Sequence, residues 1–304
     1  MTKKLVSFIL LFIVSVFYIF SEDKQVYLYQ VDPLVKVLKE RNYFRDETDT
    51  IRVARGEVAS IQIVVQGLTE IENMRATVTN ISSGTSKLTG ATTGWVGYVQ
   101  VGRSYSPPST DIIRSVSGYF PDPILPDSTF SLKPGEVQPL WISVPINTTA
   151  APGMYKGTVE ITGEVEKKKE TWIKEFYIRV YPVTLGKSPL LITNWSSHFS
   201  PVSLSFLNNN NPVEAYSPLY WELIEIHAKI MASHRQNVHR IFPIWHTQYT
   251  YKNGKYTFDF SRFDREAEIF DKVGALERIE GGHLAWRSGA WDEPFFVEVP
   301  LPDN

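Results

Sequence analysis

The feature that most constrains the fold is a series of short segments, between residues 26 and 182, in which apolar and polar residues alternate. Successive side chains of a strand point to opposite faces, so this alternation predicts half-buried strands. Turn-forming clusters such as Ser82-Ser83-Gly84 and Ala151-Pro152-Gly153 separate the segments. The pattern predicts an antiparallel β-sandwich over residues 22–182. The predicted strands are VYLYQV, IRVAR, SIQIVV, RATVTN, VGYVQV, LWISVP, GTVEIT and WIKEFYIRVYP.

The pattern changes after Pro182, and all six histidines lie beyond residue 197. Longer segments with helical spacing now alternate with short apolar runs, which predicts a parallel sheet with right-handed crossovers. We therefore expect residues 183–304 to form a second unit built on a parallel sheet with helical crossovers. The expected elements are a strand at 190–195, a helix from Pro218 to about Asn237 capped by Ser217, a strand at 240–245, a helix that begins at a Ser261–Asp264 capping box and stops at Gly274, and a strand at 276–283.

Each of these expected strands ends next to a tryptophan and a histidine. Functional groups of a parallel sheet gather at the carboxyl ends of its strands. A flat indole face beside imidazole donors suits a sugar, which has an apolar C–H face and a rim of hydroxyl groups. The candidate substrate-binding residues are Trp195, His198, Trp245, His246, His283, Trp286 and Arg287.

Composition excludes several other functions. The net charge of −2 provides no field that would attract nucleic acid. The chain has no cysteine, so it holds neither disulfides nor thiolate zinc sites. His234, His239 and His246 do not have metal-ligand spacing, and no phosphate-cradling glycine loop is present. We expect no metal, no cofactor and no nucleic-acid partner.

The first 21 residues are predicted to be an export signal, because Lys3 and Lys4 precede an apolar run from Leu5 to Phe20. That run is short for a membrane span. We expect a periplasmic, cell-surface or secreted protein with no stable membrane span once the signal is removed. An uncleaved N-terminal anchor is the alternative.

Three longer stretches resemble secreted glycoside hydrolases of family 123. GYFPDPILPDSTFSLKPGEVQPLWISVPINTTAAPGMYKGTVEI is similar to the accessory β-sandwich of these proteins. HRQN at 234–237, FDFSRFDREAEIFDKVGALERIE at 258–280 and GGHLAWRSGAWDEPF at 281–295 are similar to the beginning of their catalytic barrel. The resemblance covers nearly all of the chain after residue 21.

The resemblance implies that residues 183–304 are the N-terminal part of a (β/α)8 barrel, which is incomplete because a whole barrel takes about 250 residues. It also implies hydrolysis of terminal β-linked N-acetylhexosamine, of the galactosamine type, with retention. In that family-level mechanism the 2-acetamido oxygen of the substrate attacks the anomeric carbon, an Asp orients it, and a neighbouring Glu is the general acid and base. Asp292 and Glu293 form such a pair, but the family pattern of Trp291, Pro294 and Phe295 leaves them in variable positions. We therefore expect the catalytic pair beyond Asn304, and a truncated chain that is inactive alone.

Two functions of another class compete with this interpretation. The sandwich would serve as a non-catalytic carbohydrate-binding or adhesion module if Trp95, Tyr98, Tyr105 and Tyr119 formed an exposed stacking surface. It would serve as a purely structural module if they did not.

Overall fold

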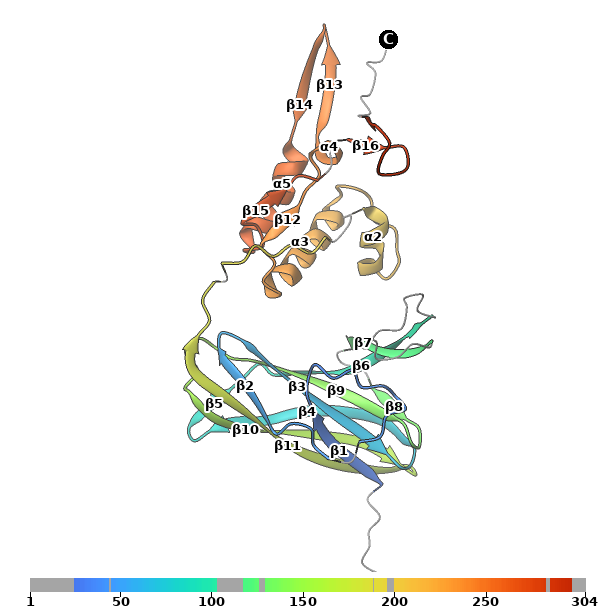
Figure 1. Ribbon diagram of the computed structural model, residues 1–304, viewed down its shortest axis with the longest axis vertical. Helices are drawn as coiled ribbons and strands as arrows, with labels where there is room; N and C mark the ends of the chain where they lie inside the picture. Colours follow the sequence, from blue (N-terminus) through green and yellow to red (C-terminus); the bar gives the residue numbers. More distant parts are fainter. Residues whose placement is uncertain are drawn as a thin grey trace, which may run out of the picture. The chain divides into compact units, whose positions relative to one another are not determined.

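A computed structural model describes residues 25–43, 45–102, 117–125, 129–187, 189–195, 200–282 and 285–296 (Figure 1). The chain divides into two compact units, residues 1–186 and residues 187–304. The predicted export signal lies outside the described residues, as do Tyr105, His198 and His283. No helix in the described ranges is both long enough and apolar enough to cross a membrane.

The first unit is a β-sandwich of two facing sheets (Figure 1). One sheet has the order β1-β3-β9-β6-β7, and the other has the order β2-β11-β10-β4-β5 with β8 paired to β4. The predicted sandwich is confirmed. All eight predicted strands lie within observed ones. Sequence reasoning missed β7 and the short strands β5 and β8. The strands are β1 (Val26–Val31), β2 (Thr50–Arg55), β3 (Val58–Gly67), β4 (Ile71–Ser83), β5 (Ser86–Leu88), β6 (Thr92–Val101), β7 (Gly118–Leu125), β8 (Phe130–Leu132), β9 (Val137–Pro145), β10 (Gly153–Val165) and β11 (Lys168–Thr184).

One pairing departs from the predicted antiparallel pattern. β2 and β11 run parallel, with Ile51 opposite Ile178. The prediction of an entirely antiparallel sandwich is therefore wrong at this edge, because alternation specifies a strand but not its neighbour.

Alternate residues of the facing strands form the core of the sandwich. Ile61 and Ile63 on β3, Ile142 on β9, and Phe176 and Ile178 on β11 are completely buried. Each buried aliphatic side chain contributes about 1.5–3 kcal/mol of transfer free energy. This apolar core holds the unit together without a disulfide.

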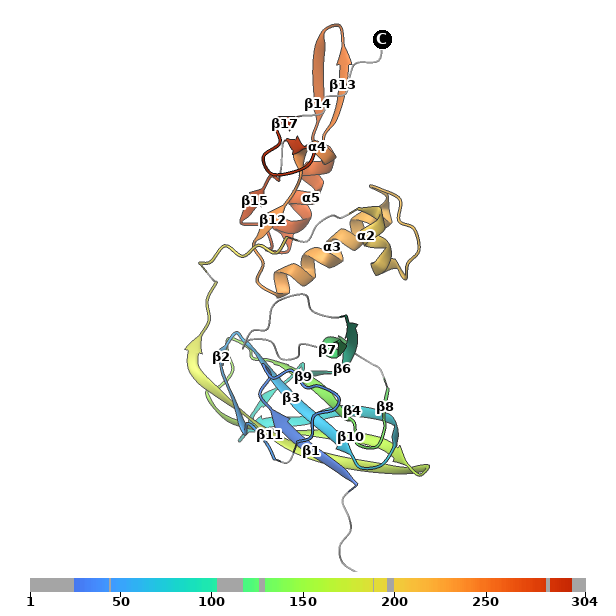
Figure 2. The ribbon, with the colours of Figure 1, turned by 45° about the vertical axis from the view of Figure 1, so that its right-hand side comes forward.

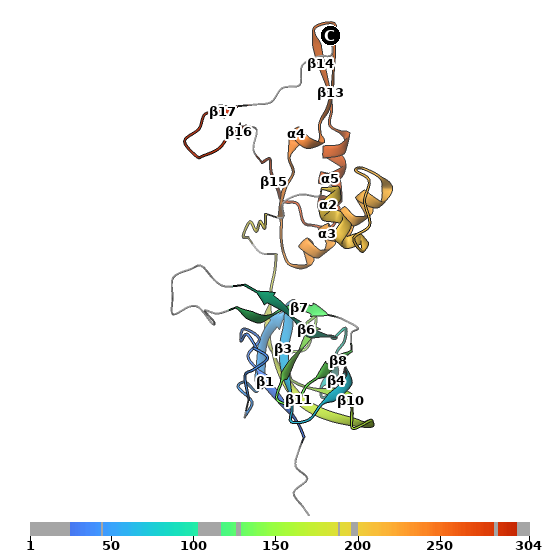
Figure 3. The ribbon, with the colours of Figure 1, turned by 90° about the vertical axis from the view of Figure 1, so that its right-hand side faces the viewer.

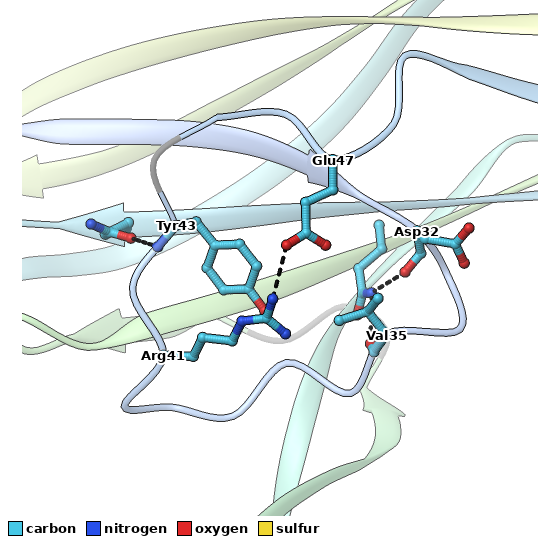
Figure 4. A network of polar contacts seen from close by, with 7 residues as sticks. Asp32, Val35, Arg41, Tyr43 and Glu47 are labelled. Carbon is cyan, nitrogen blue, oxygen red and sulfur yellow. Dashed lines mark hydrogen bonds and ion pairs between the residues drawn. The ribbon is translucent and has the colours of Figure 1, made fainter. Parts of the chain in front are cut away.

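The loop between β1 and β2 is fixed to the sheet by polar contacts (Figure 4). Gln62 on β3 donates to the carbonyl oxygens of Asp32 and Val35, each at 3.1 Å. The backbone N–H of Tyr43 donates to Oε1 of Gln66 at 2.8 Å. These buried glutamines thus join the loop to β3, and the N–H of Val137 on β9 adds a bond of 3.2 Å to the carbonyl oxygen of Lys39.

In its described residues, the second unit combines four helices with three pairs of short strands. Apart from a 3₁₀ turn at Phe206–Asn208, the elements of the described part are α2 (Pro201–Ser205), α3 (Pro218–Ser233), β12 (Val238–Arg240), α4 (Pro243–His246), β13 (Gln248–Lys252), β14 (Lys255–Asp259), α5 (Ser261–Lys272), β15 (Arg278–Glu280), β16 (Trp286–Arg287) and β17 (Phe295–Phe296). β12 and β15 pair in parallel, and α3 and α5 share an apolar core (Figure 2).

Two of the predicted strands of this unit are wrong. Residues 190–195 form no strand, although the N–H of Val238 donates to the carbonyl oxygen of Ile192 at 3.1 Å. The predicted strand at 240–245 is replaced by the end of β12 and by α4. Pro243 is the first residue of α4, where its fixed φ and missing N–H favour a helix start over a strand.

The predicted helices are present, but their ends differ. Ser217 caps α3 as predicted, since its side chain accepts from the N–H of Tyr220. α3 ends at Ser233 rather than near Asn237, because Arg235 follows with a φ of 64°. The predicted capping box of the second helix is wrong: Ser261 is already inside α5, and its N–H donates to Oδ1 of Asp259 at 2.8 Å. Gly274 has a φ of 80° just after α5, as its predicted role requires.

An unpredicted hairpin, β13–β14, extends away from α4 and α5 (Figure 3). Tyr249 lies opposite Phe258 and Tyr251 opposite Tyr256, so one face of the ribbon carries four aromatic rings. Asn253 and Gly254 both have positive φ at the turn. A two-residue Asn-Gly connection of this kind matches the twist of the two strands.

Candidate functional site

The second unit contains a pocket of about 380 Å³ between α3, β12, α4 and α5. This volume lies at the lower end of the range of about 300–1,000 Å³ that small-molecule sites occupy. The pocket is lined by Ser200, Pro201, Ala215, Tyr216, Tyr220, Arg240, Phe242, Trp245, His246 and Glu266.

Aromatic rings form most of the pocket wall. Trp245 is 44% exposed and stacks on Phe242, with ring centroids 4.2 Å apart. The hydroxyl group of Tyr216 donates to the carbonyl oxygen of Trp245 at 3.2 Å, which ties the segment before α3 to α4. Burial raises the pKa of the Tyr220 hydroxyl far above its usual value, so this group is a neutral donor. The wall thus combines flat apolar faces with hydroxyl groups.

A buried carboxyl group forms the polar part of the pocket. Glu266 on α5 is 1% exposed, and its Oε1 lies 2.8 Å from Nε2 of His239 on β12. Its Oε2 lies 3.3 Å from Nε2 of His246 on α4. The imidazole of His239 also stacks on the ring of Phe270, with centroids 3.5 Å apart.

Burial lowers the pKa of His246, and the charges of His239 and Arg262 act in the same direction. The carboxylate of Glu266 opposes this effect, but desolvation is the larger influence. His246 is therefore a neutral imidazole near pH 7, able to donate at one ring nitrogen and accept at the other. The described residues contain no group of three side chains arranged to hold a metal ion.

A second, smaller pocket of about 170 Å³ is lined by Trp195, Arg240, Glu280, Gly281 and Gly282. Nε1 of Trp195 donates to Oε2 of Glu280 at 3.1 Å. The guanidinium group of Arg240 lies 4.9 Å from the Trp195 ring and 4.4 Å from the Phe242 ring. Arg240 lines both pockets.

The structure gathers only some of the residues that the sequence singled out. Trp245 and His246 line the large pocket and Trp195 lines the small one. Arg287 lines neither; its guanidinium group lies 4.1 Å from the Phe295 ring. The backbone of Trp286 pairs with Phe296. That these residues bind a substrate remains a prediction.

The acid pair Asp292-Glu293 lies in a turn, and both residues are exposed. Neither lines the large or the small pocket.

Sequence reasoning missed His239, Glu266, Tyr216 and Tyr220. A signal for Glu266 was present, because it is three residues after Phe263 and four before Phe270, on the apolar face of the helix. An acidic residue on such a face needs a buried partner. His239 was considered only as a weak metal ligand together with His234, but His234 is exposed and its Nδ1 contacts the carbonyl oxygen of Ile230 at 2.8 Å.

The sandwich does not present the predicted row of stacking aromatics. Trp95 is 2% exposed and belongs to the core. The hydroxyl group of Tyr98 donates to the carbonyl oxygen of Val37 at 3.0 Å, and its ring is largely covered. Tyr119 is 48% exposed. The first unit is thus a β-sandwich with a packed core, and the second is a small α/β unit with an aromatic pocket.

Comparison with known proteins identifies the first unit more closely. Residues 36–163 match the family model described as the glycoside hydrolase 123 N-terminal domain. The first unit thus carries a region similar to the N-terminal domain of family 123 glycoside hydrolases, and this region makes up less than half of the chain. A search of curated proteins found no match.

Among solved structures, the chain is similar to a family 123 glycoside hydrolase from Clostridium perfringens, studied for glycolipid glycan hydrolysis. The identity is 14%, the TM-score is 0.59, and the alignment covers 84% of this chain and 46% of that one. The chain thus spans less than half the length of that structure. Two further matches have TM-scores that are too low to support an argument: the CooA pilin subunit of enterotoxigenic Escherichia coli (0.23, 12% identity, 44% of this chain and 91% of that one) and a putative membrane anchored protein of Corynebacterium diphtheriae (0.28, 14% identity, 55% and 38%).

Proposed function

We propose that the large pocket of the second unit binds a terminal β-linked N-acetylhexosamine of the galactosamine type, as part of a retaining glycoside hydrolase. The observation that supports this most is the combination of Trp245 and Phe242 with His246 in one pocket of monosaccharide scale. An indole face accepts the apolar side of a sugar ring, and a neutral imidazole donates to and accepts from its hydroxyl groups. The family-123 N-terminal domain is the second support.

In this proposal the second unit is the beginning of a (β/α)8 barrel. The parallel pair β12–β15, with α5 connecting toward β15, is the element that supports it. The substrate-assisted mechanism needs an acid that holds its proton at the working pH. The pair Asp292-Glu293 is exposed and lines neither pocket, so we assign it no catalytic role.

Ligand binding tests the assignment directly. We expect N-acetylgalactosamine to bind the full chain in a calorimetric titration, and the Trp245→Ala change to weaken binding at least tenfold. A tenfold loss corresponds to about 1.4 kcal/mol, which removal of a stacking indole accounts for. Trp291→Ala is the matched control, because Trp291 is 89% exposed and lines neither of the two pockets. Equal affinities of the Trp245→Ala variant and the unchanged chain would refute the assignment.

Hydrolysis tests the role of the acid pair. An aryl β-N-acetylgalactosaminide is the substrate, and Glu293→Gln is the variant. We expect any release of the aryl group by the chain to be the same for both proteins. A rate that Glu293→Gln abolishes would show that Glu293 is catalytic.

A further inference from the structure

One carboxylate oxygen of Glu266 is buried without a hydrogen-bond partner among the described residues. The side chains of His239, His246 and Glu266 are 2%, 11% and 1% exposed, so water reaches them poorly. Oε1 of Glu266 makes a hydrogen bond of 2.8 Å to His239. Oε2 has no hydrogen-bond partner among the described residues, although Nε2 of His246 lies 3.3 Å away.

His246 shows the same incompleteness. Its Nδ1 is buried and has no hydrogen-bond partner among the described residues. Buried polar atoms are nearly always hydrogen-bonded, and those that are not usually mark a site for water, a ligand or catalysis. Two such atoms on neighbouring side chains of one pocket therefore point to a ligand.

The position of these atoms defines what the ligand must offer. Glu266 and His246 line the large pocket, whose other described walls are mostly aromatic. In such a pocket a small number of polar groups fixes the orientation of the ligand and provides specificity. A carboxylate accepts hydrogen bonds and does not donate them, so the group that completes Oε2 is a donor.

We propose that Glu266 determines the specificity of the pocket: its Oε2 accepts a hydrogen bond from one ring hydroxyl group of the bound sugar, and it positions the imidazole of His246. This inference rests on the proposed function, since it names the group of the amino sugar that the pocket recognises. Although the 3.3 Å approach to Oε2 is not a hydrogen bond, the negative charge of the carboxylate favours the Nε2–H tautomer of His246, which leaves Nδ1 as an acceptor. A site built in this way rejects an analogue that lacks the hydroxyl group, because the buried acceptor is then left unpaired.

Deoxy sugars test the proposal. The full chain is titrated with N-acetylgalactosamine and with its 3-, 4- and 6-deoxy analogues. We expect at least one analogue to bind at least tenfold more weakly than the parent sugar. In the Glu266→Gln variant this ratio falls below about threefold, because an amide is a weaker acceptor than a carboxylate. Glu268→Gln on the exposed face of α5 is the matched control and keeps the ratio of the unchanged chain.

The tautomer of His246 provides a readout that needs no ligand. Nitrogen-15 NMR of the imidazoles is expected to show a single Nε2–H tautomer for His246, and a mixture of tautomers in Glu266→Gln. Circular dichroism establishes that the variant is folded.

The possible outcomes are distinct. If Glu266→Gln binds the parent sugar more weakly but discriminates as the unchanged chain does, Glu266 is only structural and the inference is wrong. An unchanged tautomer of His246 contradicts the positioning role. If no amino sugar binds the unchanged chain, the proposed function fails and the inference fails with it.

Discussion

Replacement of Glu266 by alanine is expected to destabilise the second unit strongly. The change removes the carboxylate that accepts the 2.8 Å hydrogen bond from the buried side chain of His239. It also removes the group 3.3 Å from Nε2 of His246. Both imidazoles then lose a buried partner at once, and the side-chain volume of Glu266 is left empty.

The expected loss follows from these contacts. Removal of one partner of a buried charged contact costs about 3–5 kcal/mol. Glu266→Gln keeps an acceptor for His239 and loses only the charge, and charged and neutral hydrogen bonds differ by about 1–2 kcal/mol. We therefore expect about 3–5 kcal/mol for alanine and about 1–2 kcal/mol for glutamine. Glu268→Ala, on the exposed face of the same helix, is expected to change stability by less than about 0.5 kcal/mol.

Urea unfolding measures these values. Tryptophan fluorescence follows both units, and the transition of the sandwich serves as an internal reference, since the change lies in residues 187–304. A loss below about 1 kcal/mol for Glu266→Ala would refute the reasoning. Equal losses for alanine and glutamine would do so too, because loss of the charge would then account for the whole effect, and the bulk and the acceptor that glutamine keeps would contribute nothing.

Three further changes test other parts of the structure. Gly157→Ala is expected to destabilise the sandwich by about 1–3 kcal/mol in thermal unfolding, because the added Cβ would lie 2.3 Å from Cζ of Phe176; an unchanged melting temperature would contradict the core described. Gly282→Ala is expected to weaken amino-sugar binding in a titration. Gly282 has a φ of 71°, and an added Cβ would lie 2.3 Å from the Phe242 ring that supports Trp245. Equal affinity would show that Phe242 moves freely. Burial lowers the pKa of His227 and of His246 below the ordinary 6.5, so below about pH 6.5 the unfolded chain binds more protons than the folded one. The second unit is therefore expected to lose stability as the pH falls below about 6.5 and to be insensitive just above it. Constant urea midpoints from pH 7 to pH 5 would contradict this.

The sandwich could be predicted from the sequence because its signal is local. Alternation between exposed and buried residues is complete within one strand, as in Tyr155 to Ile161 of β10. Pairing is not local: Ile51 and Ile178 are far apart in the sequence, and no pattern near either residue indicates that β2 and β11 run parallel. The sequence therefore predicted the strands but not this edge of the sheet.

The second unit was predicted less well because its elements are short and its turn signals compete. Pro243 was considered a strand irregularity, whereas it begins α4 and thereby turns Trp245 and His246 into the pocket. Asn253-Gly254 between aromatic residues was a hairpin signal that went unused. Trp245 and His246 line this pocket, but the sequence singled them out for their position after a strand that the structure does not have. Their role in substrate binding stays a prediction.

The buried acid was the least predictable part of the site. The sequence places Glu266 on the apolar face of a helix, but its partner His239 lies on β12 and the contact depends on how β12 and α5 pack. Side-chain contacts between distant elements are set by tertiary structure, which a helical pattern does not encode.

A crystal structure of the full chain with N-acetylgalactosamine tests the central claim most directly. The account predicts one sugar in the pocket between α3, α4 and α5, with its apolar face on Trp245 and a ring hydroxyl group within hydrogen-bonding distance of Glu266. A sugar bound elsewhere on the chain, or an empty pocket at a sugar concentration that saturates binding, would contradict it.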